Sequence, residues 1–263
     1  MTLNMVLNLQ SELASRAIRE GKRLDGRQFD EYRKITIETD ISKNAEASAR
    51  VKIGETEVVC GTKCLPNVPY PDTPDEGSIT VGLEYLPIAH AEFEPGPPQA
   101  EAIEIARVVD RGIREAKAID FGKLVIKEGE LIWNIYVDIY TLNRAGNFMD
   151  ACAIAAIKTL SDTRMPKLDA SNHIVKGEYA KKLELSRLPL EVTFYKVADK
   201  IILDATLAEE KAASARFTVA VSEDDFMSAF QKGGSGGFSQ TQINSCVELA
   251  FKKTKELRKI VFK

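Results

Sequence analysis

The stretch Leu131–Leu160, LIWNIYVDIYTLNRAGNFMDACAIAAIKTL, decides the fold. Its first half alternates apolar and polar residues, which predicts a half-buried strand over 131–142. The residues expected on the buried face of that strand are Trp133, Ile135, Val137 and Ile139. A glycine-containing turn over 143–147 leads into small apolar residues over 149–160, which predict a deeply packed helix. A strand that passes through a tight turn into a buried helix indicates an α+β unit, which we expect to end near Pro166.

The residues before this stretch predict one helix and several strands. Residues 4–20 place Leu7, Leu9, Leu13 and Ile18 at roughly helical spacing among charged residues, which predicts an amphipathic N-terminal helix within a lead-in over 1–29. Strand-like segments over 34–40, 45–53 and 57–65 follow, and they predict an antiparallel meander. A loop over 67–77, rich in proline and acidic residues, then precedes a strand over 78–86. With the strand and helix above, these segments predict a first subdomain over 30–166.

The clearest helix of the chain is predicted over Gln99–Ala118, directly after the proline-rich breaker at 94–98. Its expected apolar stripe comprises Ile103, Ala106, Val109, Ile113 and Ala116.

Three arginines lie on the opposite face of this helix, at Arg107, Arg111 and Arg114, with i, i+4 and i+7 spacing. Each guanidinium group presents a planar set of donors that suits phosphate, so this face is a candidate nucleic-acid interface. An ordinary solvated face paired with Asp110 and Glu104 would use the same residues.

The C-terminal part of the chain predicts a crossover and a second subdomain. Residues 167–190 are polar and weakly periodic, and they lead to a subdomain over 191–263 that packs closely on the first. Strands are expected over 190–197, 200–207 and 216–221, and a helix over 239–259. The run Gly233–Gly237 lacks the Lys-Ser/Thr ending of a P-loop and predicts a flexible surface turn.

Composition excludes several classes of function. The formal net charge of -3 means that the whole chain repels phosphate, so RNA binding would need a local basic patch. No apolar stretch is long enough for a membrane span, and the N-terminus lacks the apolar centre of a secretory signal, so we expect a cytoplasmic protein with reduced cysteines. The Cys60–Cys64 spacing and two histidines do not suit zinc, and they predict no metal site and no nucleophile-His-Asp arrangement.

Asp199 and Asp204 form the remaining candidate pair of carboxylates. Paired carboxylates can hold magnesium or act as acid and base. On a strand, however, their odd separation would place them on opposite faces, so we expect no shared site.

Several motifs resemble the RNase PH family over almost the whole chain. Arg23-Leu24-Asp25-Gly26-Arg27 resembles the opening motif of that family, and the predicted strand order after it agrees. The segments 92–98 and 103–114 are similar to the non-catalytic RNase PH-like subunit of the archaeal exosome. Further similarities lie at 140–156 and at Ile201-Ile202-Leu203-Asp204. The resemblance implies a ribonuclease PH-like α+β fold with two mixed sheet and helix subdomains and an N-terminal helix.

Two departures from the catalytic members of the family concern their phosphate and carboxylate positions. The resemblance places Met149 where those members carry a phosphate-binding arginine, and it places Asp150 where a carboxylate would repel phosphate. Catalytic members carry two aspartates six residues apart on one face. Here the second is retained as Asp204, the first aligns with Ala198, and Asp199 lies one residue out of register. The departures imply that the chain has no catalytic residues of its own.

The resemblance also implies partners. It predicts a hexameric ring, a trimer of heterodimers with a catalytic RNase PH-like exosome subunit, and RNA-binding cap subunits on one face. Single-stranded RNA would be held through its phosphates by Arg107, Arg111 and Arg114. Magnesium and inorganic phosphate are expected at the catalytic partner, and neither a membrane nor DNA is an expected partner. The alternatives are a catalytically active phosphorolytic exoribonuclease and a purely structural ring subunit without RNA contact.

Overall fold

The computed structural model describes residues 3–263 and contains two large sheets and one small sheet. The first sheet has the order β1 (Ile35–Thr39), β2 (Ala47–Ile53), β3 (Thr56–Asn67), β6 (Leu131–Asn143) and β4 (Ser78–Tyr85), with β5 (Val125–Lys127) paired to β6. β1, β2 and β3 form the predicted antiparallel meander. β4 runs parallel to β6. Parallel neighbours need a crossover, and α2 (Ala100–Glu115) with the short helix η1 (Phe121–Leu124) provides it.

The second sheet is antiparallel, with the order β10 (Lys200–Leu203), β9 (Leu190–Val197), β11 (Ala215–Val221) and β12 (Met227–Gly233). β10 is shorter than the predicted strand because Asp204 has a positive φ of 48°, which ends the strand. Thr206 and Glu209 then form a capping box that starts α4 (Leu207–Ala212). The sequence analysis predicted neither α4 nor β12.

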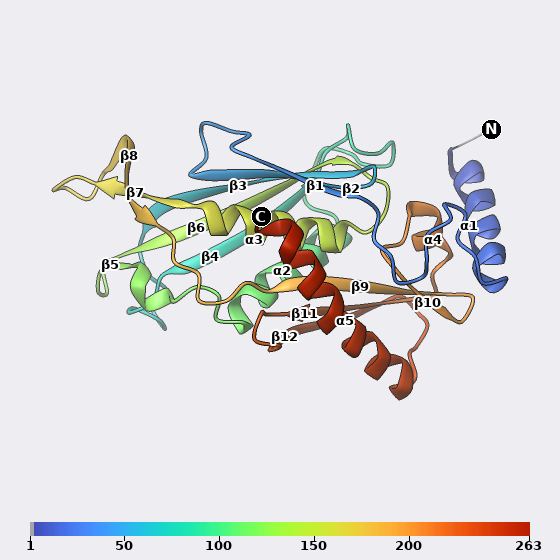
Figure 1. Cartoon of the computed structure of the whole chain (residues 1–263). Coiled ribbons are helices and arrows are strands. Elements are labelled where there is room, and N and C mark those ends of the chain that lie inside the picture. Colours follow the sequence, from blue (N-terminus) through green and yellow to red (C-terminus); the bar gives the residue numbers. More distant parts are fainter. Residues whose placement is uncertain (1–2) are drawn as a thin grey trace.

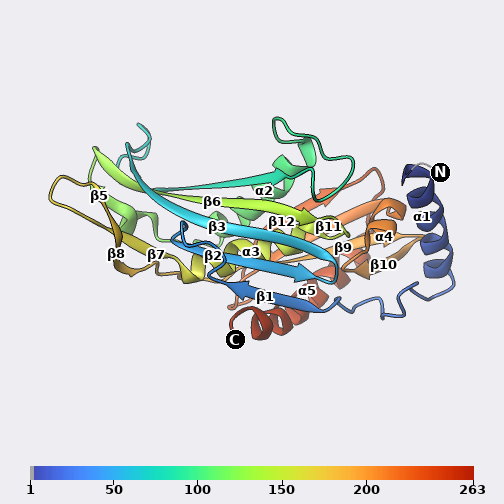
Figure 2. The same cartoon turned by 90° about the horizontal axis from the view of Figure 1, so that it is seen from above.

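Helices α2 and α3 (Phe148–Asp162) lie between the two large sheets, and α5 (Gln240–Val261) covers the outer face of the second one (Figures 1 and 2). α3 contacts β2 and β3 on one side and β9 on the other. It is therefore buried nearly all round, as its small apolar residues predict. The predicted α+β class with two sheet-and-helix subdomains is confirmed, and the N-terminal helix α1 (Leu3–Arg19) packs on α4 at one end of the molecule (Figure 1).

A hairpin of β7 (Arg164–Leu168) and β8 (Ile174–Lys182) begins at the end of the predicted first subdomain and extends into the predicted crossover. It projects from the end of the molecule opposite α1 (Figure 1). β8 is exposed along most of its length, so it lacks the alternation that identifies a strand in sequence. The subdomain boundaries after residues 29, 166 and 190 stay a prediction.

Two predicted apolar stripes are partly wrong. In α1 the buried side chains include Ala14 and Ile18, whereas Leu9 and Leu13 are about half exposed. In α2 Ile103 is 48% exposed. The buried set of α2 is wider than one stripe because the helix packs against both β4 and β12, and it comprises Ala102, Ile105, Ala106, Val108, Val109, Gly112 and Ile113.

The glycine run before α5 lies at the surface, as predicted, and its backbone packs closely at two positions. The Gly236 amide donates a 2.8 Å hydrogen bond to the Ser214 carbonyl. Gly234 has a φ of +82°, and a Cβ atom there would lie 2.7 Å from the same carbonyl oxygen. Glycine therefore allows this loop to approach the preceding strand closely.

Candidate nucleic-acid interface

The structure places Arg107, Arg111 and Arg114 along one exposed groove of about 780 Å³. α2 forms one wall, β4 contributes Ile79, Thr80 and Val81, and the loop before β4 contributes Tyr70. The three arginines thus lie on one face of the helix, as their spacing predicted, and they line the same groove. No feature of the structure tests whether RNA binds there.

The three arginines differ in how strongly the protein holds them. Arg114 donates to the Asp110 carboxylate at 2.9 Å and to the Ile79 carbonyl, and its guanidinium lies 5.4 Å from the Phe121 ring centroid. Arg111 donates a 3.0 Å hydrogen bond to the Gln231 side chain. Within residues 3–263, Arg107 has neither a hydrogen-bond nor an ion-pair partner. Arg107 and Arg111 are therefore the most available to a phosphate.

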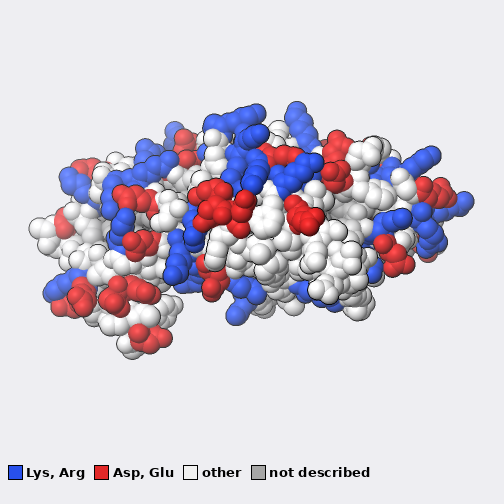
Figure 3. Space-filling view, turned by 60° about the horizontal axis from the view of Figure 1, so that its bottom comes forward, with Lys and Arg blue, Asp and Glu red and all other residues white. Residues whose placement is uncertain are grey.

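Basic and acidic groups are intermixed over the surface that Figure 3 shows, so that face carries no broad field of one sign. The groove itself also contains Glu104, Asp110 and Glu115. Of these, Glu104 pairs with Arg216 at 2.7 Å and not with the α2 arginines, contrary to the predicted pairing.

The turn before α3 is closed and buried. Asn147 and Asp150 are fully buried, and Met149 is 1% exposed within the core. Gly146 has a φ of +94° and lies so close to the β10–α4 connection that a Cβ atom would meet Ala205 and Thr206 backbone atoms. Gly146 and Asn147 of this turn therefore present no side chain to an outside ligand, and neither do Met149 and Asp150 after it.

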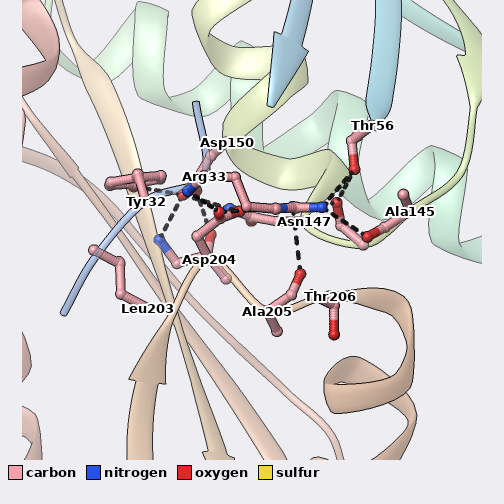
Figure 4. A network of polar contacts seen from close by, with 12 residues as sticks. Tyr32, Arg33, Thr56, Ala145, Asn147, Asp150, Leu203, Asp204, Ala205 and Thr206 are labelled. Atoms are coloured by element: carbon pink, nitrogen blue, oxygen red, sulfur yellow. Dashed lines mark hydrogen bonds and ion pairs between the residues drawn. The ribbon is translucent and has the colours of Figure 1, made fainter. Parts of the chain in front are cut away.

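Asp204 anchors a polar network behind this turn (Figure 4). Its carboxylate accepts hydrogen bonds from the guanidinium of Arg33 at 2.7 Å and 2.9 Å, from Arg27 at 3.0 Å and from the Asn147 side-chain amide at 3.0 Å. Burial alone would raise the pKa of Asp204, but the hydrogen bonds and positive charge of Arg33 lower it. Asp204 is thus an ionised structural group that binds the N-terminal lead-in to the second sheet.

The opening motif acts in the same way. Arg23 is 4% exposed and pairs with Glu209 at 2.6 Å, while it donates to the Asp204 carbonyl at 2.8 Å. Arg27 reaches Asp204 from the other end of the motif. Both arginines of the motif therefore hold the end of β10 in place.

Asp150 belongs to the same network but has no cation beside it. Its carboxyl accepts from the hydroxyls of Tyr32 and Thr193, each at 2.6 Å, and from the Asn147 side-chain amide at 2.9 Å. Burial raises the pKa of Asp150 to about 6 despite these hydrogen bonds. Asp150 and Asp204 thus share the Asn147 amide but have opposite pKa shifts.

A carboxylate of the protein itself lies at the N-terminus of α3. The backbone amide of Asn147 donates to Glu210 at 3.1 Å, and the Tyr195 hydroxyl donates to the same oxygen at 2.7 Å. Helix N-termini attract anions because their amides lack partners within the helix. Glu210 satisfies this one, so the residues present here do not fit a bound phosphate at Asn147.

A charged pocket of about 420 Å³ adjoins Glu210 and separates α1 and α4 from α2. Its walls mix cations with carboxylates, among them Arg144, Lys211 and Arg216 beside Glu101, Glu104 and Glu210. Arg144 pairs with Glu101 at 3.3 Å, and Arg216 pairs with Glu104. The cations are thus partly neutralised by the protein.

The candidate pair of carboxylates, Asp199 and Asp204, does not meet, as the sequence analysis predicted. Asp204 is fully buried, whereas the Asp199 side chain is 95% exposed. Ala198 and Asp199 both have positive φ and form the two-residue turn between β9 and β10, because Val197 pairs with Lys200. Asp199 therefore lies at a hairpin turn and not on a strand. The prediction that the two carboxylates lie apart is correct, but the strand geometry on which it was based is wrong.

No group of three or more His, Cys, Asp or Glu side chains in the described part of the chain is arranged to hold a metal ion. The four cysteines are buried thiols. Among the helices of residues 3–263, none is both long and apolar enough to cross a membrane.

Several residues of these sites escaped sequence reasoning. Arg33 lies 171 residues from Asp204, and Glu210 lies 63 residues from Asn147. Such separations leave no periodic signal. Tyr70 could have been singled out from the sequence, because it is an aromatic residue within a loop of prolines and acidic residues.

The fold and the buried turn define the class of protein as an α+β protein with two sheet-and-helix subdomains around α2 and α3. The 3′ exoribonuclease family matches this chain twice, through domain 1 over residues 31–166 and domain 2 over residues 187–253. The chain belongs to this family, and within it the chain is an RNase PH-like subunit of the archaeal exosome kind.

Curated relatives cover nearly the whole chain. The chain is 42% identical to the exosome complex component Rrp42 of Thermococcus kodakarensis over 94% of its length and 92% of the relative. It is 41% identical to the Rrp42 component of Methanocella arvoryzae, over 98% of this chain and 97% of the relative.

Solved structures agree with the fold. A chain of the Archaeoglobus fulgidus exosome with RNA bound to the active site superposes with a TM-score of 0.92 at 39% identity, over 98% of this chain and 100% of that one. A chain of an archaeal exosome core gives a TM-score of 0.89 at 36% identity, with both chains fully covered.

Proposed function

We propose that this chain is a non-catalytic component of an archaeal exosome, a 3′-to-5′ phosphorolytic exoribonuclease complex. It contributes to ring assembly, binds RNA and positions the RNA for a catalytic RNase PH-like partner subunit. The proposed assembly is a hexameric ring, a trimer of heterodimers, with RNA-binding cap subunits, and its proposed location is the cytoplasm. Magnesium and inorganic phosphate would act at the catalytic partner.

The observation that carries the non-catalytic role is the Glu210 carboxylate at the Asn147 amide. Phosphorolysis needs an inorganic phosphate held beside the RNA end, and the Glu210 side chain already occupies the position at the helix terminus that such an anion would take. Met149 adds no cation, because its thioether is uncharged, and its side chain lies in the core. These features disfavour the alternative of an active phosphorolytic enzyme.

The observation that favours RNA contact over a purely structural role is the availability of Arg107 and Arg111. Both side chains are exposed in the groove, and neither has a carboxylate partner within residues 3–263. Phosphates of a single strand would replace water around these guanidinium groups and release counterions, independent of the base sequence.

The test replaces Arg107 and Arg111 together with glutamate in the ring reconstituted with the catalytic partner. Exposed charges contribute little to stability, so folding and assembly should remain near wild type. Affinity for a single-stranded oligonucleotide should fall. The dependence of log K on log salt should flatten by about 0.7 for each lost phosphate contact, about 1.4 in total. Fluorescence polarisation over a salt series measures both quantities.

A matched control makes the same charge change at Arg16 and Arg19, which are exposed on α1 outside the groove. This control should keep the wild-type salt slope. Wild-type affinity and slope in the assembled Arg107→Glu/Arg111→Glu ring would instead support the purely structural alternative.

A further inference from the structure

The arginine groove has little net charge, and this limits what phosphate contacts alone can contribute. Asp110 neutralises Arg114, and Glu104 is held by Arg216 and by Gln231. Arg107, Arg111 and Glu115 are the remaining charged residues of the groove. A single strand held only by these charges would bind weakly and would be released as salt rises.

Tyr70 adds a second kind of surface to the same groove. It lies in the loop between β3 and β4, lines the groove and is 64% exposed. An aromatic ring this exposed gains little from burial within its own chain, whereas a flat π surface beside guanidinium groups suits a nucleobase.

The loop holds Tyr70 in position through its backbone. The Thr73 amide donates to the Tyr70 carbonyl at 3.1 Å, and the Gly129 amide donates to the Pro74 carbonyl at 3.0 Å. At the end of the loop the Gly77 amide donates to the Phe121 carbonyl at 2.9 Å. The backbone that carries Tyr70 is thereby ordered before RNA binds, which lowers the entropy cost of placing its ring against a base.

We propose that Tyr70 stacks on an unpaired base of the RNA strand whose phosphates contact Arg107 and Arg111. This inference rests on the proposed function and assigns the groove a base-binding residue. Stacking accepts every base, because each has a π face, and a base inside a duplex cannot reach the ring. Tyr70 therefore makes the groove select single strands without selecting a sequence.

The loop after Tyr70 carries only negative charge, at Asp72, Asp75 and Glu76, and these carboxylates repel phosphates. In the proposed arrangement the backbone of the strand lies toward the α2 arginines, and the base lies toward Tyr70.

The first measurement compares Tyr70→Ala, Tyr70→Phe and Val68→Ala in the reconstituted ring, by polarisation with a labelled single-stranded oligonucleotide. Tyr70→Ala should weaken binding about fivefold or more, since stacking contributes about 1–3 kcal/mol per base. Its salt slope should stay at the wild-type value because no phosphate contact is lost. Tyr70→Phe keeps the ring, and Val68→Ala changes a neighbouring residue that is 70% exposed, so both should bind as wild type.

A second measurement uses oligonucleotides with one abasic position moved along the strand. When the abasic position falls at the stacked base, the wild-type ring should lose affinity. The Tyr70→Ala ring should lose none there, because it has no aromatic ring for that base to stack on. Equal losses for both rings at every position would overturn the inference.

The outcomes separate this inference from the function on which it rests. If Tyr70→Ala leaves affinity unchanged while Arg107→Glu/Arg111→Glu flattens the salt slope, the stacking role is wrong and the phosphate role stands. If neither variant changes binding, both are wrong. If Tyr70→Ala prevents ring assembly in light scattering, Tyr70 contacts a partner subunit and the stacking role is overturned.

Discussion

At the residue scale, the network before α3 holds two carboxyl groups under opposite conditions. Arg33 and Arg27 surround Asp204, and the hydrogen bonds and charge of Arg33 overcome burial and lower its pKa. Asp150 receives only neutral donors, and burial raises its pKa to about 6. Folding therefore favours the ionised form of Asp204 and the protonated form of Asp150.

Because the pKa of Asp150 is higher in the folded chain than in the unfolded chain, the free energy of unfolding falls as pH rises. Below about pH 4 both the folded and the unfolded chain hold this proton, so Asp150 imposes no penalty there. Between about pH 4 and the folded pKa of about 6, the unfolded chain loses its proton first, and stability decreases. Above the folded pKa the full penalty of the buried charge, on the order of 2–3 kcal/mol, is present.

Asp150→Asn should therefore stabilise the protein at about pH 8 and have little effect at about pH 4. The amide oxygen can accept from Tyr32 and Asn147, and the amide nitrogen can donate to the Thr193 hydroxyl, which then donates to Thr218 at 3.0 Å. Urea unfolding at both pH values measures the difference. Asp199→Asn is the control, because it removes the same charge at an exposed turn and should change neither value. A loss of stability by Asp150→Asn at the higher pH would contradict the assignment.

At the element scale, the turn between β6 and α3 depends on Gly146. Its φ of +94° is costly for any other residue, and a Cβ atom would lie 2.5 Å from the Thr206 carbonyl carbon. The turn also carries the Gly146 carbonyl, which accepts from Arg33 at 3.0 Å. This one residue thus joins the first sheet, the lead-in and the start of α4.

Gly146→Ala should destabilise the chain by roughly 3 kcal/mol or more, because strain and a backbone clash act together. Gly177→Ala provides the control. Gly177 has a φ of +78° but has open space around it, so its replacement should cost only about 1 kcal/mol of strain. Thermal unfolding of both variants compares them, and equal losses would show that the contact with the β10–α4 connection is unimportant.

The predicted and missed elements differ in how they are buried. β6 and α2 have periodic burial, β9 and α3 are buried along nearly their whole length, and all four were located from the sequence within a few residues. β8 is almost fully exposed, α4 has only six residues, and buried and exposed residues alternate poorly in β12. None of these elements therefore shows a clear periodicity of apolar residues in the sequence. The exposure of Ile103 was missed because it depends on which sheets enclose α2.

The candidate site shows the same limit. Helical spacing placed Arg107, Arg111 and Arg114 together correctly, because all three lie on one helix. The partners that decide their availability, such as Gln231, come from another sheet. The pairing of Arg33 with Asp204 likewise depends on how the lead-in crosses the second sheet, which no local pattern contains.

At the scale of the whole molecule, both large sheets end in edge strands, β1 and β4 in one sheet and β10 and β12 in the other. Large apolar side chains are also exposed, including Met5, Leu9 and Ile88 at 58%, 49% and 78%. Uncovered edges and apolar side chains are typical of surfaces that neighbouring subunits bury. These features support a role that the chain fulfils in an assembly.

The isolated chain should therefore release no nucleoside diphosphates from RNA in the presence of inorganic phosphate and magnesium. Glu210 already occupies the Asn147 amide, Met149 is buried without charge, and Asp204 is fully engaged by Arg27 and Arg33, so these positions offer no group to hold inorganic phosphate at the RNA end or to protonate a leaving oxygen. The assay compares this chain, the catalytic partner and the reconstituted complex on one labelled single-stranded RNA, with and without phosphate. Only phosphate-dependent release counts, because a contaminating hydrolytic nuclease would act equally in both conditions. We expect none from the chain and robust release from the complex, whereas phosphate-dependent release by the chain alone would make it an active phosphorolytic exoribonuclease.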